Sequence, residues 1–229
     1  PVLDDTTVTV ISGADTTPPT VVSIVDDDAD NLLALNQMVT YTVSFSEDID
    51  SATVSASDFD NAGSSSITVG TITETSPGVF AVQVTPTSGN SLRLRIVGTI
   101  KDVAGNDLVV PVQDDDTLTV DAIAPTVTNI TNNSSGILFA ESSITYTVSF
   151  SENIEASSLS TSDFSNAGTA SVVFGTLSQI SPSVYTLVVT PTSGGTLRLQ
   201  LPAGAIVKDI AGNNAVVPVQ DDEELTVTP

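Results

Sequence analysis

An internal repeat is the feature that most restricts what this chain of 229 residues can fold into. The segment VTYTVSFSE at Val39–Glu47 returns as ITYTVSFSE at Ile144–Glu152, and the segment TPTSG that begins at Thr85 returns at Thr190. A partial third copy at Pro1–Val10 matches two later stretches, Pro111–Val120 and Pro218–Val227. The sequence therefore predicts two bodies of nearly equal length, preceded by one strand of an earlier repeat.

Within each body the apolar residues recur at every second position. Val39, Tyr41, Val43 and Phe45 alternate with small polar residues, which is typical of a half-buried strand. In the first body we expect seven strands, at 20–25, 38–45, near Phe59, 66–72, 79–84, 92–96, and at 108–120 with an interruption near Pro111. About 100 residues with seven short strands predict an all-β fold of tandem immunoglobulin-like β-sandwiches, antiparallel and placed end to end.

Three segments follow from this pattern. Residues 1–17 are expected to hold the last strand of a preceding repeat and a linker, 18–121 the first Ig-like domain, and 122–229 the second. An odd number of strands puts the start and the end of the chain at opposite poles of each sandwich. We call these the N-terminal and the C-terminal pole.

Short motifs at corresponding places in the two bodies resemble bacterial Ig-like repeats. They are the linkers DTTPPT and DAIAPT, the VSFSE runs, the SDF triplets that end at Phe59 and Phe164, and the KDxAGN turns that begin at Lys101 and Lys208. Such repeats occur in very long secreted or surface-anchored bacterial proteins, often adhesins. The resemblance implies a non-catalytic extender that holds a binding or anchoring end away from the cell.

Composition excludes most kinds of catalytic site. The chain has 28 acidic and 5 basic residues, a net charge of −23, and no His, Cys or Trp. It therefore lacks an imidazole base, a thiolate, a zinc-type ligand set and disulfides, and we expect no enzyme. So many negative charges disfavour nucleic acid as a partner, and no apolar run is long enough to predict membrane insertion. Scarce aromatic residues argue against a sugar-binding cleft.

Acidic residues are the remaining candidates for a site. In a seven-strand sandwich the incoming linker, the loop after the second strand and the loop before the last strand share the N-terminal pole. This arrangement brings together Asp15, Glu47 and Asp102 in the first body, and Asp121, Glu152 and Asp209 in the second. Clustered carboxylates from several loops are ligands that Ca²⁺ prefers, so we expect calcium at the junctions between bodies.

Each of these residues also has a simpler interpretation. Asp102 and Asp209 are good turn residues before a glycine, Glu47 and Glu152 can be solvated strand ends, and the linker aspartates can be ordinary polar linker residues.

A further group of predicted ligands follows the first strand. Asp26, Asp28 and Asp30 have the one-three-five spacing of a calcium loop, but Asn31 and Gln37 stand where an EF-hand has its glycine and bidentate glutamate. The second body has Asn132, Asn133 and Ser134 at this place, so we expect no binding there.

Pairs of aspartates next to a proline recur in the last strand of each copy: Asp4 and Asp5, Asp114 and Asp115, and Asp221 and Asp222. Their expected role is to block edge-to-edge pairing of that strand rather than to bind a ligand.

Two functions remain open. The first is a spacer of a large extracellular or cell-surface bacterial protein that binds calcium and its neighbouring repeats, with any adhesive ligand outside this segment. The alternative is an extracellular filament subunit, in which the strand at Pro1–Val10 completes the sheet of an identical subunit by strand addition.

Overall fold

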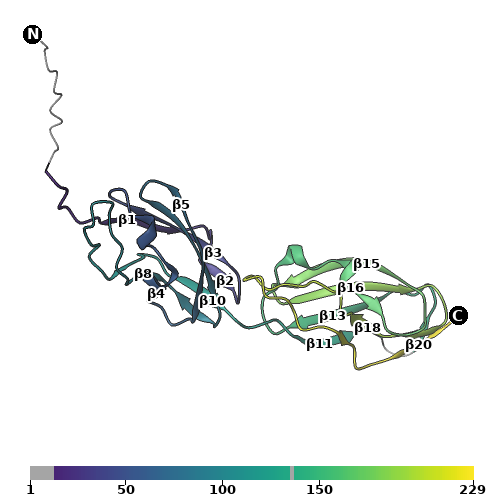
Figure 1. The fold of residues 1–229 in the computed structure, drawn as a ribbon. Coiled ribbons are helices and arrows are strands. Elements are labelled where there is room, and N and C mark those ends of the chain that lie inside the picture. Colours follow the sequence, from purple (N-terminus) through teal and green to yellow (C-terminus); the bar gives the residue numbers. More distant parts are fainter. Residues whose placement is uncertain (1–12, 135–136) are drawn as a thin grey trace, which may run out of the picture. The chain divides into compact units, whose positions relative to one another are not determined.

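The computed structural model describes residues 13–134 and 137–229. The chain divides into unit 1, Pro1–Val120, and unit 2, Asp121–Pro229 (Figure 1). This division lies one residue before the boundary expected at 121. The strand expected at Pro1–Val10 falls outside the described residues. Helical structure among the described residues consists of 3₁₀ turns, and none of these helices has the length and apolarity to span a membrane.

Unit 1 is a β-sandwich whose larger sheet has the strand order β1-β3-β6-β5. These strands are β1 (Val21–Asp26), β3 (Val39–Phe45), β6 (Val79–Pro86) and β5 (Ile67–Ser76). The second layer consists of two ladders, β4-β8-β9 and β2-β10-β7. Its strands are β4 (Phe59–Asn61), β8 (Leu94–Ile96), β9 (Val112–Gln113), β2 (Leu32–Ala34), β10 (Leu118–Asp121) and β7 (Asn90–Leu92).

Unit 2 repeats this topology, with sheets β11-β13-β16-β15, β14-β18-β19 and β12-β20-β17. The larger sheet contains β11 (Val127–Asn132), β13 (Ile144–Phe150), β16 (Val184–Pro191) and β15 (Val172–Ser181). The other strands are β14 (Ser165–Asn166), β18 (Leu199–Leu201), β19 (Val219–Gln220), β12 (Leu138–Phe139), β20 (Leu225–Thr228) and β17 (Gly195–Leu197). β12 pairs with β20 in parallel, unlike the antiparallel pairing expected throughout.

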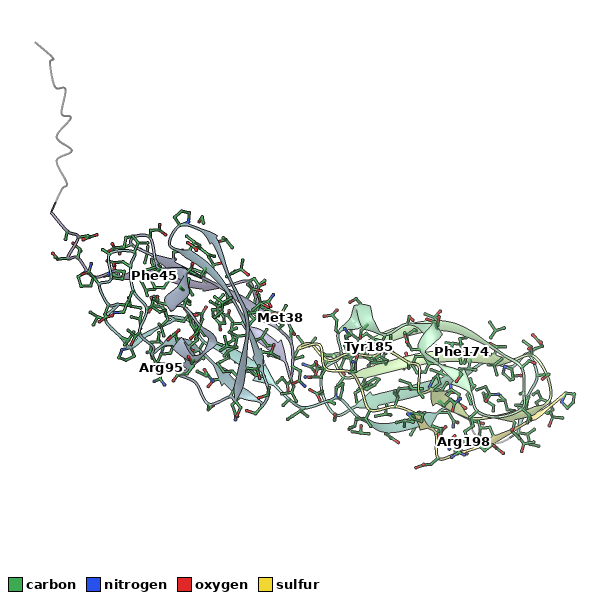
Figure 2. The ribbon with its side chains drawn as sticks, viewed as in Figure 1. Met38, Phe45, Arg95, Phe174, Tyr185 and Arg198 are labelled. Atoms are coloured by element: carbon green, nitrogen blue, oxygen red, sulfur yellow. The ribbon has the colours of Figure 1, made fainter. Side chains whose placement is uncertain are left out.

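The core of each unit forms from the alternating residues of the strands. In β3, every second residue from Val39 to Phe45 is buried, and β13 has the same pattern. These side chains pack against leucines and isoleucines of the opposite layer. Edge-to-face aromatic pairs add to the packing, with ring centroids 5.9 Å apart for Phe45 and Phe80 and 6.1 Å apart for Phe150 and Tyr185. Figure 2 labels Phe45 and Tyr185 within their units.

The predicted all-β, Ig-like fold is confirmed, but two details of the strands differ. The short strand β2 was not predicted, because three residues are too few to establish a period. The continuous strand expected at 92–96 is broken at Arg93 into β7 and β8. The last strand, for which an interruption was expected near Pro111, is interrupted between β9 and β10.

An asparagine side chain explains the break at Arg93. The Oδ1 atom of Asn61 accepts hydrogen bonds from the backbone N–H of Arg93 at 2.7 Å and of Gly63 at 2.8 Å. Its Nδ2 atom donates to the carbonyl oxygens of Ser65 and Ser91. Asn166 makes the same four hydrogen bonds in unit 2. This side chain therefore replaces ladder hydrogen bonds where the strand changes its partner.

Replacing Asn166 by alanine should destabilise unit 2, because four partly buried backbone groups lose their partner. We expect Asn166→Ala to lower the free energy of unfolding by roughly 2 to 4 kcal/mol, measured by urea denaturation. Asn129→Ala, at an exposed position, is the control and should change it little. Equal effects of the two substitutions would contradict this role of Asn166.

Candidate metal centre

The structure brings together the three acidic residues predicted at the N-terminal pole of unit 1. Asp15, Glu47 and Asp102 each offer a carboxylate oxygen, and these three oxygens lie within 4.8 Å of one another. Asp15 comes from the linker before β1, Glu47 from the loop after β3, and Asp102 from the turn after β8. An isolated β-bridge between Ile49 and Asp102 holds the last two segments side by side.

The turn after β8 fixes the position of Asp102. Asp102 is 1% exposed, its Oδ1 accepts the backbone N–H of Asn106 at 2.8 Å, and its Oδ2 accepts the side-chain Nδ2 of Asn106 at 2.7 Å. Gly105 has a φ of 96°, which the turn requires and which glycine adopts without strain. The Nδ2 of Asn106 also donates to the carbonyl oxygen of Asp15 at 3.2 Å, so the KDxAGN motif ties the linker to the turn.

Unit 2 contains the same cluster. Carboxylate oxygens of Asp121, Glu152 and Asp209 lie within 4.8 Å of one another. Asp209 is 2% exposed, and Asn213 binds both of its oxygens, at 2.8 and 2.9 Å. The Oε1 atom of Glu152 is buried and has no hydrogen-bond partner among the described residues. A buried carboxylate oxygen that lacks a donor is a position where a proton or a cation is needed.

The linker of unit 2 is held against its own sandwich. The Nδ2 of Asn213 donates to the carbonyl oxygen of Asp121 at 3.2 Å. The backbone N–H of Val216 donates to the carbonyl oxygen of Pro125 at 2.9 Å. The N–H of Thr126 donates to the hydroxyl of Ser151 at 2.9 Å. Asp121 is both the last residue of β10 and the first residue of unit 2.

The pKa values of Asp102 and Glu47 are shifted in opposite directions. Burial acts to raise the pKa of Asp102, but hydrogen bonds from Asn106, Gly105 and Ala104 more than offset it, so the pKa of Asp102 is lowered and the carboxylate stays ionised. Burial, followed by the charges of Asp15 and Asp102, raises the pKa of Glu47.

Glu152 is in the same situation as Glu47. Burial and then the charges of Asp209 and Asp121 raise its pKa. In each cluster the pKa of the glutamate is thus raised by burial and by the neighbouring aspartates. Three hard oxygen donors near backbone carbonyl groups fit Ca²⁺.

The predicted ligands after β1 are arranged differently. Among the described residues, groups of three carboxylates within 4.8 Å are limited to the two N-terminal poles, so Asp26, Asp28 and Asp30 do not form one. Asp26 and Asp28 are partly buried and bind backbone N–H groups, whereas Asp30 is exposed.

Sequence reasoning missed two buried aspartates. Asp114 and Asp221 are 4% and 3% exposed, although they were expected on the surface as charges that block edge pairing. The carbonyl oxygens of Asp114 and Asp221 accept the Nε–H of Arg93 and Arg198, both at 2.6 Å. Recurrence of an aspartate at the same place in all three copies was the signal in the sequence for a specific role.

Comparison with known families agrees with the geometry. Residues 15–118 match the family model of the bacterial Ig-like domain. Unit 1 is a bacterial Ig-like domain. Unit 2 has the same strand order and the same acidic cluster as this Ig-like domain. A comparison with curated proteins finds no match.

Several solved structures are similar to this pair of Ig-like units. The Escherichia coli adhesin FdeC has a TM-score of 0.40 and 15% identity, and the match covers 92% of this chain and 63% of FdeC. The Yersinia pseudotuberculosis adhesin InvE has a TM-score of 0.32 and 16% identity, with 90% and 58% covered. Domains 5–6 of the S-layer protein SbsC have a TM-score of 0.29 and 15% identity, with 92% and 100% covered. The chain spans less than two thirds of the two adhesin structures.

Removing one charge from a cluster should stabilise its unit when no divalent cation is present. In a chelating buffer of low ionic strength we expect Glu152→Gln to raise the free energy of unfolding by about 1 kcal/mol, the Coulomb energy of two unit charges about 4 Å apart in a water-like medium. Urea denaturation measures the change. Glu224→Gln, at an exposed position outside the cluster, should have no comparable effect. A destabilised Glu152→Gln variant would contradict this electrostatic description.

Proposed function

We propose that this chain is a non-catalytic spacer segment of a larger, adhesin-type bacterial protein at the cell surface or outside the cell. In this proposal Ca²⁺ bound at each N-terminal pole stiffens the connection to the preceding repeat. Asp15, Glu47 and Asp102 would hold one ion, and Asp121, Glu152 and Asp209 the other. Ca²⁺ would supply positive charge to a group of three closely spaced carboxylates.

The place of Asp121 in the chain is the observation that carries the proposal. It closes β10, whose residue Val120 pairs with Asn90 in unit 1, and its carboxylate belongs to the cluster of unit 2. No residue of the chain separates the end of β10 from this cluster. A cation bound there would therefore restrain the backbone at the point where one unit passes into the next.

A location outside the cell agrees with the proposed calcium sites. Ca²⁺ modules of extracellular proteins bind with dissociation constants of about 10⁻⁴ to 10⁻³ M, which suit the surroundings of a cell better than its interior. A net charge of −23 produces strong self-repulsion, and divalent cations reduce it. The chain has no cysteine, so disulfides cannot supply this stability.

The spacer is favoured over the filament subunit because each described unit supplies its own last strand. In unit 1, β9 pairs with β8 and β10 with β7, and in unit 2, β19 pairs with β18 and β20 with β17. Strand addition from another subunit is therefore not required to complete either of the two sandwiches.

Calcium removal tests the proposal. At about 10 to 100 times the dissociation constant, one bound ion should stabilise its unit by about 1.4 to 2.7 kcal/mol. This corresponds to a rise of the melting temperature of roughly 5 to 20 °C relative to chelator. Small-angle X-ray scattering should show a longer maximum dimension and less flexibility with calcium.

The double variant Glu47→Gln/Glu152→Gln should lose both the rise of the melting temperature and the change in scattering that calcium causes. The control Glu74→Gln/Glu224→Gln also removes two acidic groups, both of them exposed and outside the clusters. This control should still respond to calcium in both measurements. Identical melting curves and scattering of the wild type in calcium and in chelator would refute the stiffening role.

A further inference from the structure

Unit 1 has a second group of acidic side chains, whose charges act on Tyr41. Tyr41 is 0% exposed, and its hydroxyl group has no hydrogen-bond partner among the described residues. Asp26 lies directly opposite Tyr41 in the ladder between β1 and β3. Side chains of directly opposed residues project to the same face of a sheet and are close neighbours. Asp26 is thus a same-face neighbour of Tyr41, whose buried hydroxyl lacks a partner among the described residues.

Three more carboxylates lie in the same region. Asp28 follows Asp26 and donates its backbone N–H to the Oδ1 of Asp26 at 3.0 Å. Asp114 and Asp116 belong to the segment between β9 and β10, and the N–H of Asp116 donates to the Oδ1 of Asp114 at 3.3 Å. The Nδ2 of Asn31 donates to Asp116 at 3.2 Å and joins the two segments. We call Asp26, Asp28, Asp114 and Asp116 the Tyr41 cluster.

The charges of this cluster act on one another and on the tyrosine. Burial, and after it the charges of Asp26, Asp114, Asp116 and Asp28, raises the pKa of Tyr41. Burial also raises the pKa of Asp26 and of Asp114, and neighbouring carboxylates raise both further. The nearby cation, Arg93, donates its Nε–H to the carbonyl oxygen of Asp114. The cluster is therefore a region of concentrated negative charge around a buried polar group.

Unit 2 shows how the same place is arranged when an amide replaces a carboxylate. Asn132 lies opposite Tyr146, as Asp26 lies opposite Tyr41. The Nδ2 of Asn132 donates to the Oε2 of Glu223 at 3.0 Å. Glu223 stands two residues after Asp221, as Asp116 stands two residues after Asp114. In unit 1 the residue opposite the tyrosine is an acid, and the amide that donates to Asp116 comes from Asn31 instead.

We propose that the Tyr41 cluster binds an additional Ca²⁺ ion in unit 1, and that the corresponding place in unit 2 does not. The cation offsets the repulsion between the two acidic segments, which in unit 1 contribute the four carboxylates of the cluster. Ca²⁺ accepts six to eight oxygen ligands in flexible geometry, so carboxylates, backbone carbonyl groups and water can share its coordination. Because these carboxylates are more widely spaced than those of the N-terminal poles, this ion binds more weakly. The site is independent of the two clusters of the proposed function.

Luminescence of Tb³⁺, which replaces Ca²⁺, gives a direct test on the full chain. The chain has no Trp and three tyrosines, so only Tyr41, Tyr146 and Tyr185 can sensitise the emission of a bound ion. Tyr41→Phe should remove a component of the emission that Ca²⁺ displaces from the wild type. Tyr146→Phe makes the same change in unit 2 and should leave this component intact. Unchanged emission in Tyr41→Phe would overturn the proposal.

A calorimetric Ca²⁺ titration provides a second readout. Asp26→Asn gives unit 1 the residue type of unit 2 and should reduce the stoichiometry by one ion per chain. Asp30→Asn, an exposed control with the same change of charge in the same loop, should keep it. An unchanged stoichiometry in Asp26→Asn would contradict the proposal. So would a gain in the stability of this variant that is equal with and without calcium, because it would show that the carboxylates share a proton and bind no ion.

These variants also separate the new site from the proposed function. In Glu47→Gln/Glu152→Gln the emission carried by Tyr41 should persist, whereas the binding at the N-terminal poles is lost. Loss of every Tb³⁺ signal in that double variant would place all ions at the N-terminal poles and would overturn the inference about Tyr41.

Discussion

Repulsion between carboxylates at the N-terminal pole is the constraint on which the arrangement of each unit depends. Asp102 and Asp209 are almost fully buried, yet the amide and backbone N–H groups of Asn106 and Asn213 bind their oxygens. These hydrogen bonds fix both carboxylates beside a glutamate, and in Asp102 they lower the pKa despite its burial. The turn motif KDxAGN therefore does more than reverse the chain, because it holds a buried carboxylate beside the other two acids of the cluster.

The sequence was sufficient to predict the strands that carry the core, since period two in β3 and β13 needs no knowledge of the rest of the fold. It was not sufficient for the second layer. The break at Arg93 depends on Asn61, a residue 32 positions away whose side chain takes the N–H of Arg93. A local pattern of alternating leucines cannot show which of two ladders each half of a strand will join, so β7 and β8 were predicted as one strand.

The grouping of Asp15, Glu47 and Asp102 was predictable because strand parity alone assigns loops to poles. Asp114 and Asp116 were not predicted as members of a cluster, since charged residues beside a proline are usually exposed. In the structure, the backbone of Asp114 binds Leu94 and Arg93, and these contacts draw its carboxylate inside. Whether such an aspartate faces water depends on tertiary contacts, which the sequence around it does not contain.

Comparison of the two units shows which acidic residues are the same in both copies of the repeat and which differ. Both N-terminal poles have the same three acids and the same asparagine, although the second copy has an insertion nearby and many other substitutions. The residues opposite the buried tyrosines differ, with aspartate at position 26 and asparagine at position 132. In a linear array, the stability of the whole depends on each unit and on its junctions with neighbours. In the proposed function a cation bound at this cluster acts on the junction with the preceding repeat, which would require the same acids in every copy. The surroundings of Tyr41 and Tyr146 lie within single units, so one copy can use an amide where the other uses a carboxylate.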